Sequence, residues 1–161
     1  MDTARSAESS IRVLLCDDSR PVRLMMERLL HQAFARHSKR ELDLTILGAT
    51  PEEVRTVTTV GPAFHMIVCD LNLGTLDDNG NDLLGSDIAR SLRLNPSWNG
   101  LFVLQTASPP DVMAELSKDL AIDLLLDKET GLWRNADEIV FYYEERAMLP
   151  YAVGTVDSNL V

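Results

Sequence analysis

Five short apolar runs recur along the chain, and each is followed by polar residues and then by a stretch with helical periodicity. The runs lie at 11–17, 42–49, 64–70, 101–106 and 121–127. Runs of this length that alternate with amphipathic segments are typical of parallel strands joined by right-handed helical crossovers. We therefore predict an α/β fold, a doubly wound five-stranded parallel sheet with five helices.

Amphipathic periodicity places the predicted helices at 21–33, 51–61, 86–94, 109–120 and 135–148. Asn135 is expected to cap the last helix, and Glu138 three residues later would complete a capping box. Periodicity ends near residue 148. We therefore expect one domain at 10–148 between an N-terminal tail of residues 1–9 and a C-terminal tail of residues 149–161.

The composition narrows the class of protein. A net charge of −10 over 161 residues argues against a nucleic-acid backbone as a direct partner. The sequence has no run of about 18 apolar residues that would span a membrane, and its first residues lack the apolar core of a signal peptide. The missing signal peptide and the content of only two cysteines favour a protein of the reducing cytoplasm. The oligomeric state stays open.

Chemically active side chains follow four of the five apolar runs. Asp17 and Asp18 end the first run, Asp70 the third, Thr106 the fourth and Lys128 the fifth. In doubly wound sheets the carboxyl ends of the strands form the ligand-binding edge. Clustered carboxylates favour a hard cation such as Mg²⁺, and an ammonium and a hydroxyl bind phosphoryl oxygens. The set predicts a phosphoryl-transfer site with an aspartate nucleophile.

Asp17-Asp18, Asp70, Thr106-Ala107 and Lys128, in this order at successive strand ends, resemble the receiver domain of bacterial two-component response regulators. The resemblance covers roughly residues 10–148 and implies the flavodoxin-like strand order 2-1-3-4-5. It implies that Asp70 is the phospho-acceptor. It further implies that Asp18 and Asp70 ligate Mg²⁺ directly, Asp17 through water, and Asn72 through its backbone carbonyl.

The resemblance also implies how such a chain would work. Lys128 would hold the acyl phosphate, and the Thr106 hydroxyl would move towards it and change a protein-binding surface. The phosphoryl donor would be a histidine kinase or a phosphotransfer protein, and the output a contact with a downstream protein. No enzymatic activity is expected beyond self-phosphorylation and slow autodephosphorylation.

Three features depart from the family pattern. Glu129 follows the lysine where the family has a proline in a cis bond, and we predict a trans bond because a non-proline cis bond costs about 3 kcal/mol. Leu125 stands where a switch aromatic is expected. The loop 71–85 is longer than usual, and we hypothesise that it shields or reshapes access to Asp70.

These residues allow other interpretations. A receiver-shaped scaffold that acts without phosphorylation is one alternative. A haloacid-dehalogenase-like phosphatase is another, suggested by DLNLGT, although Asn72 replaces that family's general acid. The loop acids Asp77, Asp78 and Asp82 do not fit EF-hand spacing and are expected to be solvated. Cys16 and Cys69 are expected to be small core residues.

Overall fold

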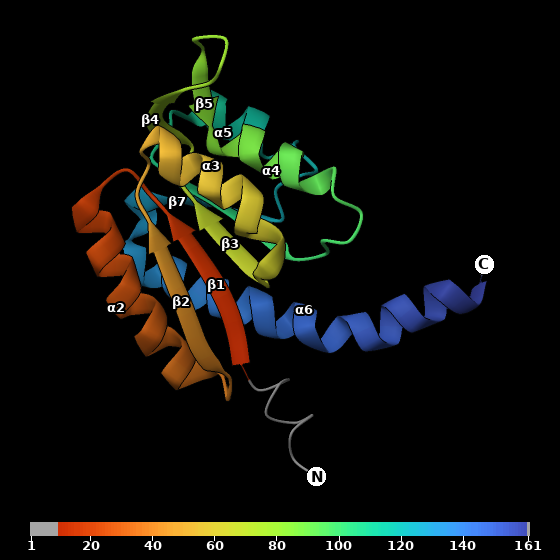
Figure 1. Cartoon of the computed structure of the whole chain (residues 1–161). Helices are drawn as coiled ribbons and strands as arrows, with labels where there is room; N and C mark the ends of the chain where they lie inside the picture. Colours follow the sequence, from red (N-terminus) through yellow and green to blue (C-terminus); the bar gives the residue numbers. More distant parts are fainter. Residues whose placement is uncertain (1–9, 161) are drawn as a thin grey trace.

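The computed structural model describes the backbone of residues 10–160 and the side chains of residues 10–147 (Figure 1). Five strands form one parallel sheet in the order β2-β1-β3-β6-β7. Their bounds are β1 Ser10–Cys16, β2 Glu41–Leu47, β3 Met66–Cys69, β6 Leu101–Thr106 and β7 Leu124–Asp127. When the five strands of this sheet are counted along the chain, β6 is the fourth and β7 the fifth. The order is then the predicted 2-1-3-4-5, so the flavodoxin-like fold is confirmed.

Helices cover both faces of the sheet (Figure 1). On one face, α2 (Arg20–His37) and α6 (Leu132–Leu160) pack against side chains such as Val13, Met66 and Val103. On the other face, α3 (Pro51–Val60), α4 (Gly85–Arg93) and α5 (Pro110–Leu116) cover a second apolar cluster around Ile67 and Phe102. Short 3₁₀ turns lie at η1 (Gly61–Ala63) and η2 (Lys128–Thr130). The central strands are therefore buried on both sides, as their apolar sequences predict.

Local sequence fixes where several helices begin. Ser19 caps α2 by accepting a hydrogen bond from the Val22 N–H, and proline follows the cap. Thr50 caps α3 by accepting from the Glu53 N–H, and the Glu53 carboxylate in turn accepts from the Thr50 hydroxyl. These caps set the direction in which each helix leaves its strand end.

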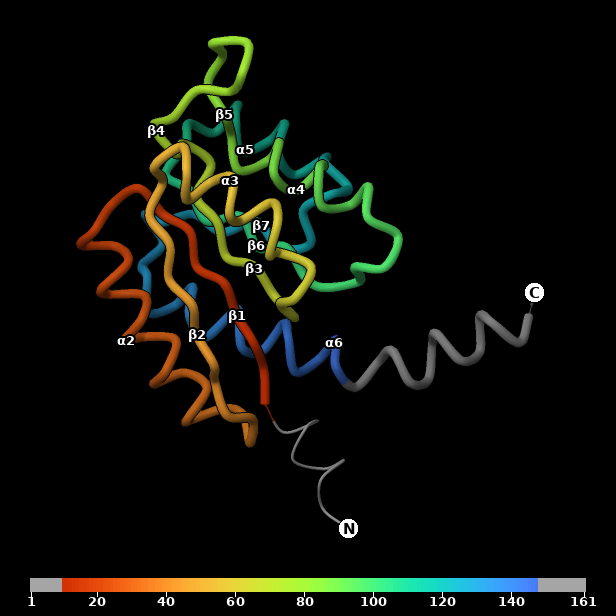
Figure 2. The backbone as a smooth tube through the Cα atoms, in the orientation of Figure 1, coloured from red at the N-terminus to blue at the C-terminus, as the bar shows by residue number. Residues whose placement is uncertain are grey.

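The long acidic segment after β3 is a β-hairpin rather than an irregular loop. Strands β4 (Asn72–Leu76) and β5 (Asp82–Leu84) pair antiparallel, and Figure 2 shows the hairpin projecting beyond the main sheet next to α5. At its tip, Asp77 Oδ1 accepts from the N–H groups of Asn79 and Asn81, both at 2.9 Å. Gly80 has a φ of 80°, so the Asn79-Gly80 pair forms the turn of the hairpin, as this dipeptide favours.

Several predicted helix boundaries were wrong: α2, predicted to end at residue 33, continues to His37. α5 ends at Leu116, short of the predicted residue 120, and Leu120 is exposed. α6 begins at Leu132, so Asn135 lies in its first turn and is not its cap. The Asn135 N–H donates to the Gly131 carbonyl, and its side chain is occupied by buried partners.

At the chain ends, the backbone of α6 continues to Leu160, past the residue at which periodicity ends. The expected N-terminal tail, residues 1–9, lies outside the described residues. Within the described part, none of the helices combines the length and apolar character needed to cross a bilayer.

Candidate functional site

The predicted site residues meet at the edge where the parallel strands end. Asp17 and Asp70 each extend their strand by one backbone hydrogen bond: the Asp17 N–H donates to the Leu47 carbonyl at 3.3 Å, and the Asp70 N–H to the Cys16 carbonyl at 3.0 Å. These bonds fix the two carboxylates side by side at the ends of neighbouring strands. Both residues are buried.

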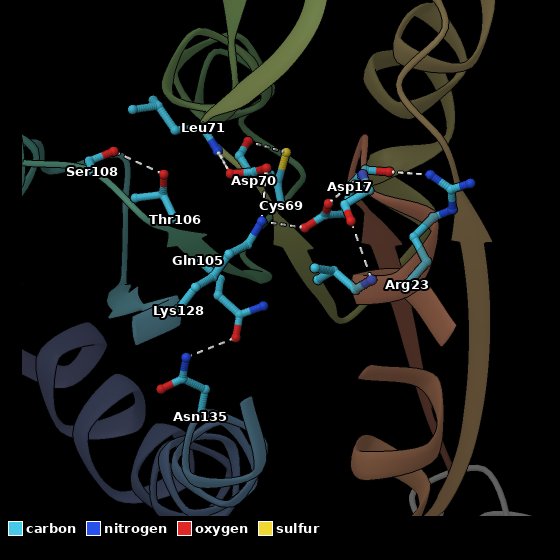
Figure 3. Close-up of polar contacts among 12 residues, drawn as sticks. Asp17, Arg23, Cys69, Asp70, Leu71, Gln105, Thr106, Ser108, Lys128 and Asn135 are labelled. Carbon is cyan, nitrogen blue, oxygen red and sulfur yellow. Dashed lines mark hydrogen bonds and ion pairs between the residues drawn. The ribbon is translucent and has the colours of Figure 1, made fainter. Parts of the chain in front are cut away.

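Lys128 joins the two carboxylates. Its ammonium Nζ lies 2.9 Å from Asp17 Oδ2 and 2.9 Å from Asp70 Oδ2 (Figure 3). Burial raises the pKa of Asp70 to about 6 against the opposing effect of Lys128, with Asp17 and Asp18 adding to the rise. Burial would lower the pKa of Lys128, but the two carboxylates outweigh it and hold that pKa above its usual value. At neutral pH the site therefore contains an ammonium between two carboxylates.

A third carboxylate completes the acidic cluster. Ligand oxygens of Asp17, Asp18 and Asp70 all lie within 4.8 Å of one another, and Asp18 is exposed whereas the other two are buried. Hard oxygen donors at this spacing match what Mg²⁺ takes from proteins. The cluster is therefore open to solvent on the Asp18 side.

Backbone donors orient the buried carboxylates. Asp17 Oδ1 accepts from the Ser19 N–H at 2.8 Å, and Asp70 Oδ1 accepts from the Leu71 N–H at 2.7 Å. Arg23 on α2 donates to the backbone carbonyl of Asp17 at 2.7 Å. In each carboxylate one oxygen is fixed by the backbone and the other faces Lys128, so the carboxylate orientation is set before any ligand arrives.

Thr106 ends β6 at the same edge, and its hydroxyl already has a partner. Thr106 Oγ1 and Ser108 Oγ lie 2.9 Å apart, and Figure 3 shows Ser108 on the side of Thr106 away from Asp70. Thr106 is 1% exposed. A buried hydroxyl without a partner is costly, so Ser108 stabilises the present orientation.

The base of the hairpin lies against the site. A Cβ added to Gly85 would lie 2.1 Å from the Asp70 carbonyl oxygen, so the chain approaches closely there only because this residue is glycine. Gly74 has a φ of 67°, and a Cβ there would lie 3.9 Å from Asp18 Oδ2. Asn72, whose backbone carbonyl is predicted to bind Mg²⁺, is the first residue of β4 and is exposed. The hairpin thus borders the open side of the acidic cluster.

The predicted departures are also visible. The Lys128–Glu129 bond is trans, as are the other peptide bonds described. Asp127, next to Lys128, accepts from the Glu129 N–H at 2.9 Å and so caps η2 instead of joining the site. Leu125 is partly buried against the core beneath α5. The end of β7 therefore continues through a trans peptide bond into a 3₁₀ turn that begins at Lys128.

Some contributors were missed by sequence reasoning. Arg23 lies in an amphipathic helix and Ser108 two residues after a strand, and neither belongs to a motif that predicts its contact at the site. The backbone donors of Ser19 and Leu71 carry no residue-type signal, because any residue supplies an N–H. Gly74 and Gly85 give no sequence signal either, because their close contacts depend on the folded backbone.

Comparisons with known proteins support the fold. The sequence matches no protein-family model, and no curated protein matches it in sequence. The response regulator receiver domain protein from Clostridium thermocellum is similar in structure, with a TM-score of 0.62 at 16% identity over 86% of this chain and 98% of that chain. A CheY-like receiver domain protein from Methanospirillum hungatei gives 0.61 at 16% identity, over 87% and 98%.

A third solved structure, the Mn²⁺-bound form of response regulator Rcp1, has a TM-score of 0.59 at 18% identity. It is matched over 83% of this chain and 94% of that chain. At these identities the similarity is one of fold. This chain has the fold of the response-regulator receiver domains.

Proposed function

We propose that the chain is a phosphorylation-dependent signalling receiver in which Asp70 accepts a phosphoryl group from a histidine kinase or a phosphotransfer protein. The observation that carries this is the position of Lys128 Nζ, 2.9 Å from an oxygen of both Asp17 and Asp70. This ammonium lowers the repulsion between the two carboxylates and is ready to bind phosphoryl oxygens.

The reaction uses the Asp70 oxygen that faces Lys128. That oxygen attacks the phosphorus of a phosphohistidine, a P–O bond forms, and the P–N bond breaks. The imidazole leaves with the bonding electron pair and takes up a proton from solvent. Asp70 Oδ1 stays on the Leu71 N–H, and Lys128 exchanges Asp70 Oδ2 for a phosphoryl oxygen while it keeps Asp17.

The donor set fits Mg²⁺. Asp18 and Asp70 would hold the ion directly, Asp17 through water and Asn72 through its carbonyl, and the acidic ligand atoms lie within 4.8 Å of one another. When bound, the ion would neutralise charge on the phosphoryl oxygens. The Mn²⁺-bound form of Rcp1 shows that a protein of this fold has been solved with a divalent cation.

The switch would start at Thr106. Its hydroxyl turns from Ser108 to the new phosphoryl oxygens and pulls the end of β6 with it. The neighbouring surface of α5, β7 and α6 holds a cavity of about 590 Å³ lined by Met113, Leu125 and Phe141 among others. A downstream protein would read the change there, in the cytoplasm, with no direct contact to nucleic acid or membrane.

Chemical phosphorylation tests the proposal. Incubation with acetyl phosphate and Mg²⁺ should add the mass of one phosphoryl group, and Asp70→Asn should abolish the addition while Asp78→Asn, an exposed hairpin acid, keeps it. Addition that survives Asp70→Asn would overturn the proposal. Sustained turnover of p-nitrophenyl phosphate would point instead to a phosphatase. Partner binding unaffected by Asp70→Asn would point to a scaffold.

A further inference from the structure

A second cavity lies at the opposite edge of the sheet, where the strands begin. Its volume is about 300 Å³, and its walls include Arg12, His65, Trp98, Tyr143 and Arg146. Volumes of this size are at the lower end for small-molecule sites. Arg12 is near the start of β1 and His65 directly precedes β3, so the cavity is about 16 Å from Asp17 and Asp70 along the strands.

The charge of this cavity is opposite to that of the protein. The chain carries 25 acidic residues and a net charge of −10. Even so, the 13 residues that line the cavity include two arginines and no aspartate or glutamate. A concave site with one sign of charge concentrates ligands of the other sign. The cavity is therefore complementary to an anion.

Within the residues whose side chains are described, the two arginines of this cavity keep hydrogen-bond donors that other protein groups do not use. Arg12 donates Nε to the Ala63 carbonyl at 2.8 Å, and Arg146 donates Nε and Nη2 to the Tyr142 hydroxyl. Neither bond uses the Arg12 terminal nitrogens or Arg146 Nη1. A carboxylate or phosphate accepts hydrogen bonds from guanidinium groups in this geometry.

His65 adds a hydrogen-bond donor, because its contact with Arg12 fixes which ring nitrogen carries the proton. Its Nδ1 accepts from the Arg12 N–H at 2.9 Å. Burial, followed by the charges of Arg12 and Arg40, lowers the pKa of His65. A neutral imidazole whose Nδ1 is an acceptor carries its proton on Nε2. The ring therefore carries an N–H donor at the cavity wall without adding a titrating positive charge at neutral pH.

Apolar side chains line part of the cavity, among them Pro62, Phe64 and Leu101. Trp98 is 6% exposed; its indole N–H donates to the Phe64 carbonyl at 2.9 Å, and Arg93 lies 4.7 Å from its ring centroid, so the ring is fixed. Burial raises the pKa of Tyr143, so its phenol stays neutral. Apolar walls beside cationic donors suit an organic ligand with an acidic group.

We propose that this cavity binds a small organic anion, a carboxylate or a phosphate ester carried on an apolar body. Its residues belong to the starts of β1, β3 and β6 and to α6, and none of them takes part in the phosphoryl-transfer site. The inference therefore stands apart from the proposed function, and Asp70→Asn should bind the anion as the wild type does.

Nuclear magnetic resonance of the full-length chain tests the proposal with two isosteric probes, benzoate and the neutral benzamide. Benzoate should shift the Trp98 indole signal saturably, with a Kd on the order of 1 mM. The Trp133 indole, which lines the other cavity, is the internal control. Benzamide should bind about 10-fold more weakly, because it lacks the charge that the arginines recognise.

Phenyl phosphate tests whether the site prefers a phosphate ester to a carboxylate. Inorganic phosphate tests whether the ligand needs an apolar body. Phenyl phosphate should bind at least as well as benzoate if the site prefers phosphate esters, and inorganic phosphate should not shift Trp98. Among the described residues, Arg146 bonds to Tyr142 of its own helix and to no other side chain, so Arg146→Gln should fold normally and weaken benzoate binding several-fold. Arg134→Gln, which alters an arginine beside Trp133, should leave it unchanged.

Three results would overturn the proposal: equal affinity for benzoate and benzamide, benzoate binding that Arg146→Gln does not weaken, or no saturable Trp98 shift with any of the organic anions. Shifts confined to Trp133 would place the anion in the other cavity and would equally overturn it.

Discussion

Thr106 Oγ1 and Ser108 Oγ lie 2.9 Å apart at the end of β6, and this bond holds the hydroxyl of Thr106 in its present orientation. In the proposed switch that hydroxyl has to leave Ser108 for a phosphoryl oxygen. Ser108 therefore competes with the phosphoryl group for the same hydroxyl, and its removal should favour the phosphorylated conformation.

Ser108→Ala should bind beryllofluoride in the presence of Mg²⁺ about 5-fold more tightly than the wild type, since a neutral hydrogen bond contributes about 1 kcal/mol. Titration followed by the tryptophan fluorescence change measures this. Ser117→Ala removes a hydroxyl that bonds within its own helix end and should leave the affinity unchanged. An unaltered affinity in Ser108→Ala would show that Ser108 does not restrain the switch.

Lys128→Met should make folding more dependent on Mg²⁺. Without the ammonium, Asp17 and Asp70 face each other unpaired, and we expect a loss of about 3 kcal/mol in the free energy of unfolding in metal-free buffer. Mg²⁺ should restore more stability to this variant than it adds to the wild type, and a chelator should remove the gain. Denaturant unfolding with and without Mg²⁺ measures both effects.

The matched control for this prediction is Lys118→Met. Lys118 forms an exposed ion pair with Glu115, so its loss should change neither the stability nor the response to Mg²⁺. If Mg²⁺ raises the free energy of unfolding equally in Lys128→Met and in the wild type, the ammonium and the cation do not interact with the same carboxylates.

Gly85→Ala should be strongly destabilising. The added Cβ would lie 2.1 Å from the Asp70 carbonyl oxygen and 2.8 Å from Leu104 Cδ1, so β3 and α4 would have to separate at about 3 kcal/mol or more. Gly80→Ala at the hairpin tip, where a Cβ meets nothing within 4 Å, should cost only the strain of its positive φ, about 1 kcal/mol. Equal losses of unfolding free energy in Gly85→Ala and Gly80→Ala would contradict the predicted clash at residue 85.

Shortening the hairpin should speed loss of the phosphoryl group. Strand β4 borders the acidic cluster at Gly74, where an added Cβ would lie 3.9 Å from Asp18 Oδ2. Replacing residues 75–82 with a two-residue turn should give water better access to Asp70 and raise the dephosphorylation rate several-fold. The variant Asp78→Asn/Asp82→Asn keeps the hairpin and removes two charges, so it separates shielding from electrostatics. An unchanged rate in the shortened chain would exclude shielding.

The resemblance to receiver domains predicted the sheet order, and the apolar runs predicted that Asp17, Asp70, Thr106 and Lys128 stand at strand ends. The second prediction follows because the carboxyl ends of parallel strands share one edge of the sheet. The hairpin was not predicted as strands. Its buried positions, Leu73 and Thr75, alternate over only five residues, which is too short a run to separate a strand from a loop that carries an Asn-Gly turn.

Asn135 shows a different kind of failure. The sequence Asn-Ala-Asp-Glu has the residues of a capping box, but a cap depends on which groups compete for the side chain. In the structure the Asn135 amide Nδ2 donates to Gln105 Oε1 at 3.0 Å and to the Asp127 carbonyl at 2.9 Å. The partners lie on β6 and β7, 30 and 8 residues away in sequence, so tertiary contacts overrode the local pattern.

These contacts give a last prediction. Asn135 connects β6, β7 and α6 in a buried position, and Gln105 Nε2 is already buried without a partner in the described structure. Asn135→Ala leaves Gln105 Oε1 and the Asp127 carbonyl unpaired as well, so the free energy of unfolding should fall by about 2 kcal/mol. Adding Gln105→Leu removes both polar groups of the glutamine, and the double variant should lose less than the sum of the two single changes. A double-mutant cycle by urea unfolding measures this coupling. Strict additivity would mean that the two amides do not depend on each other, and that α6 is held to the end of β6 by apolar packing alone.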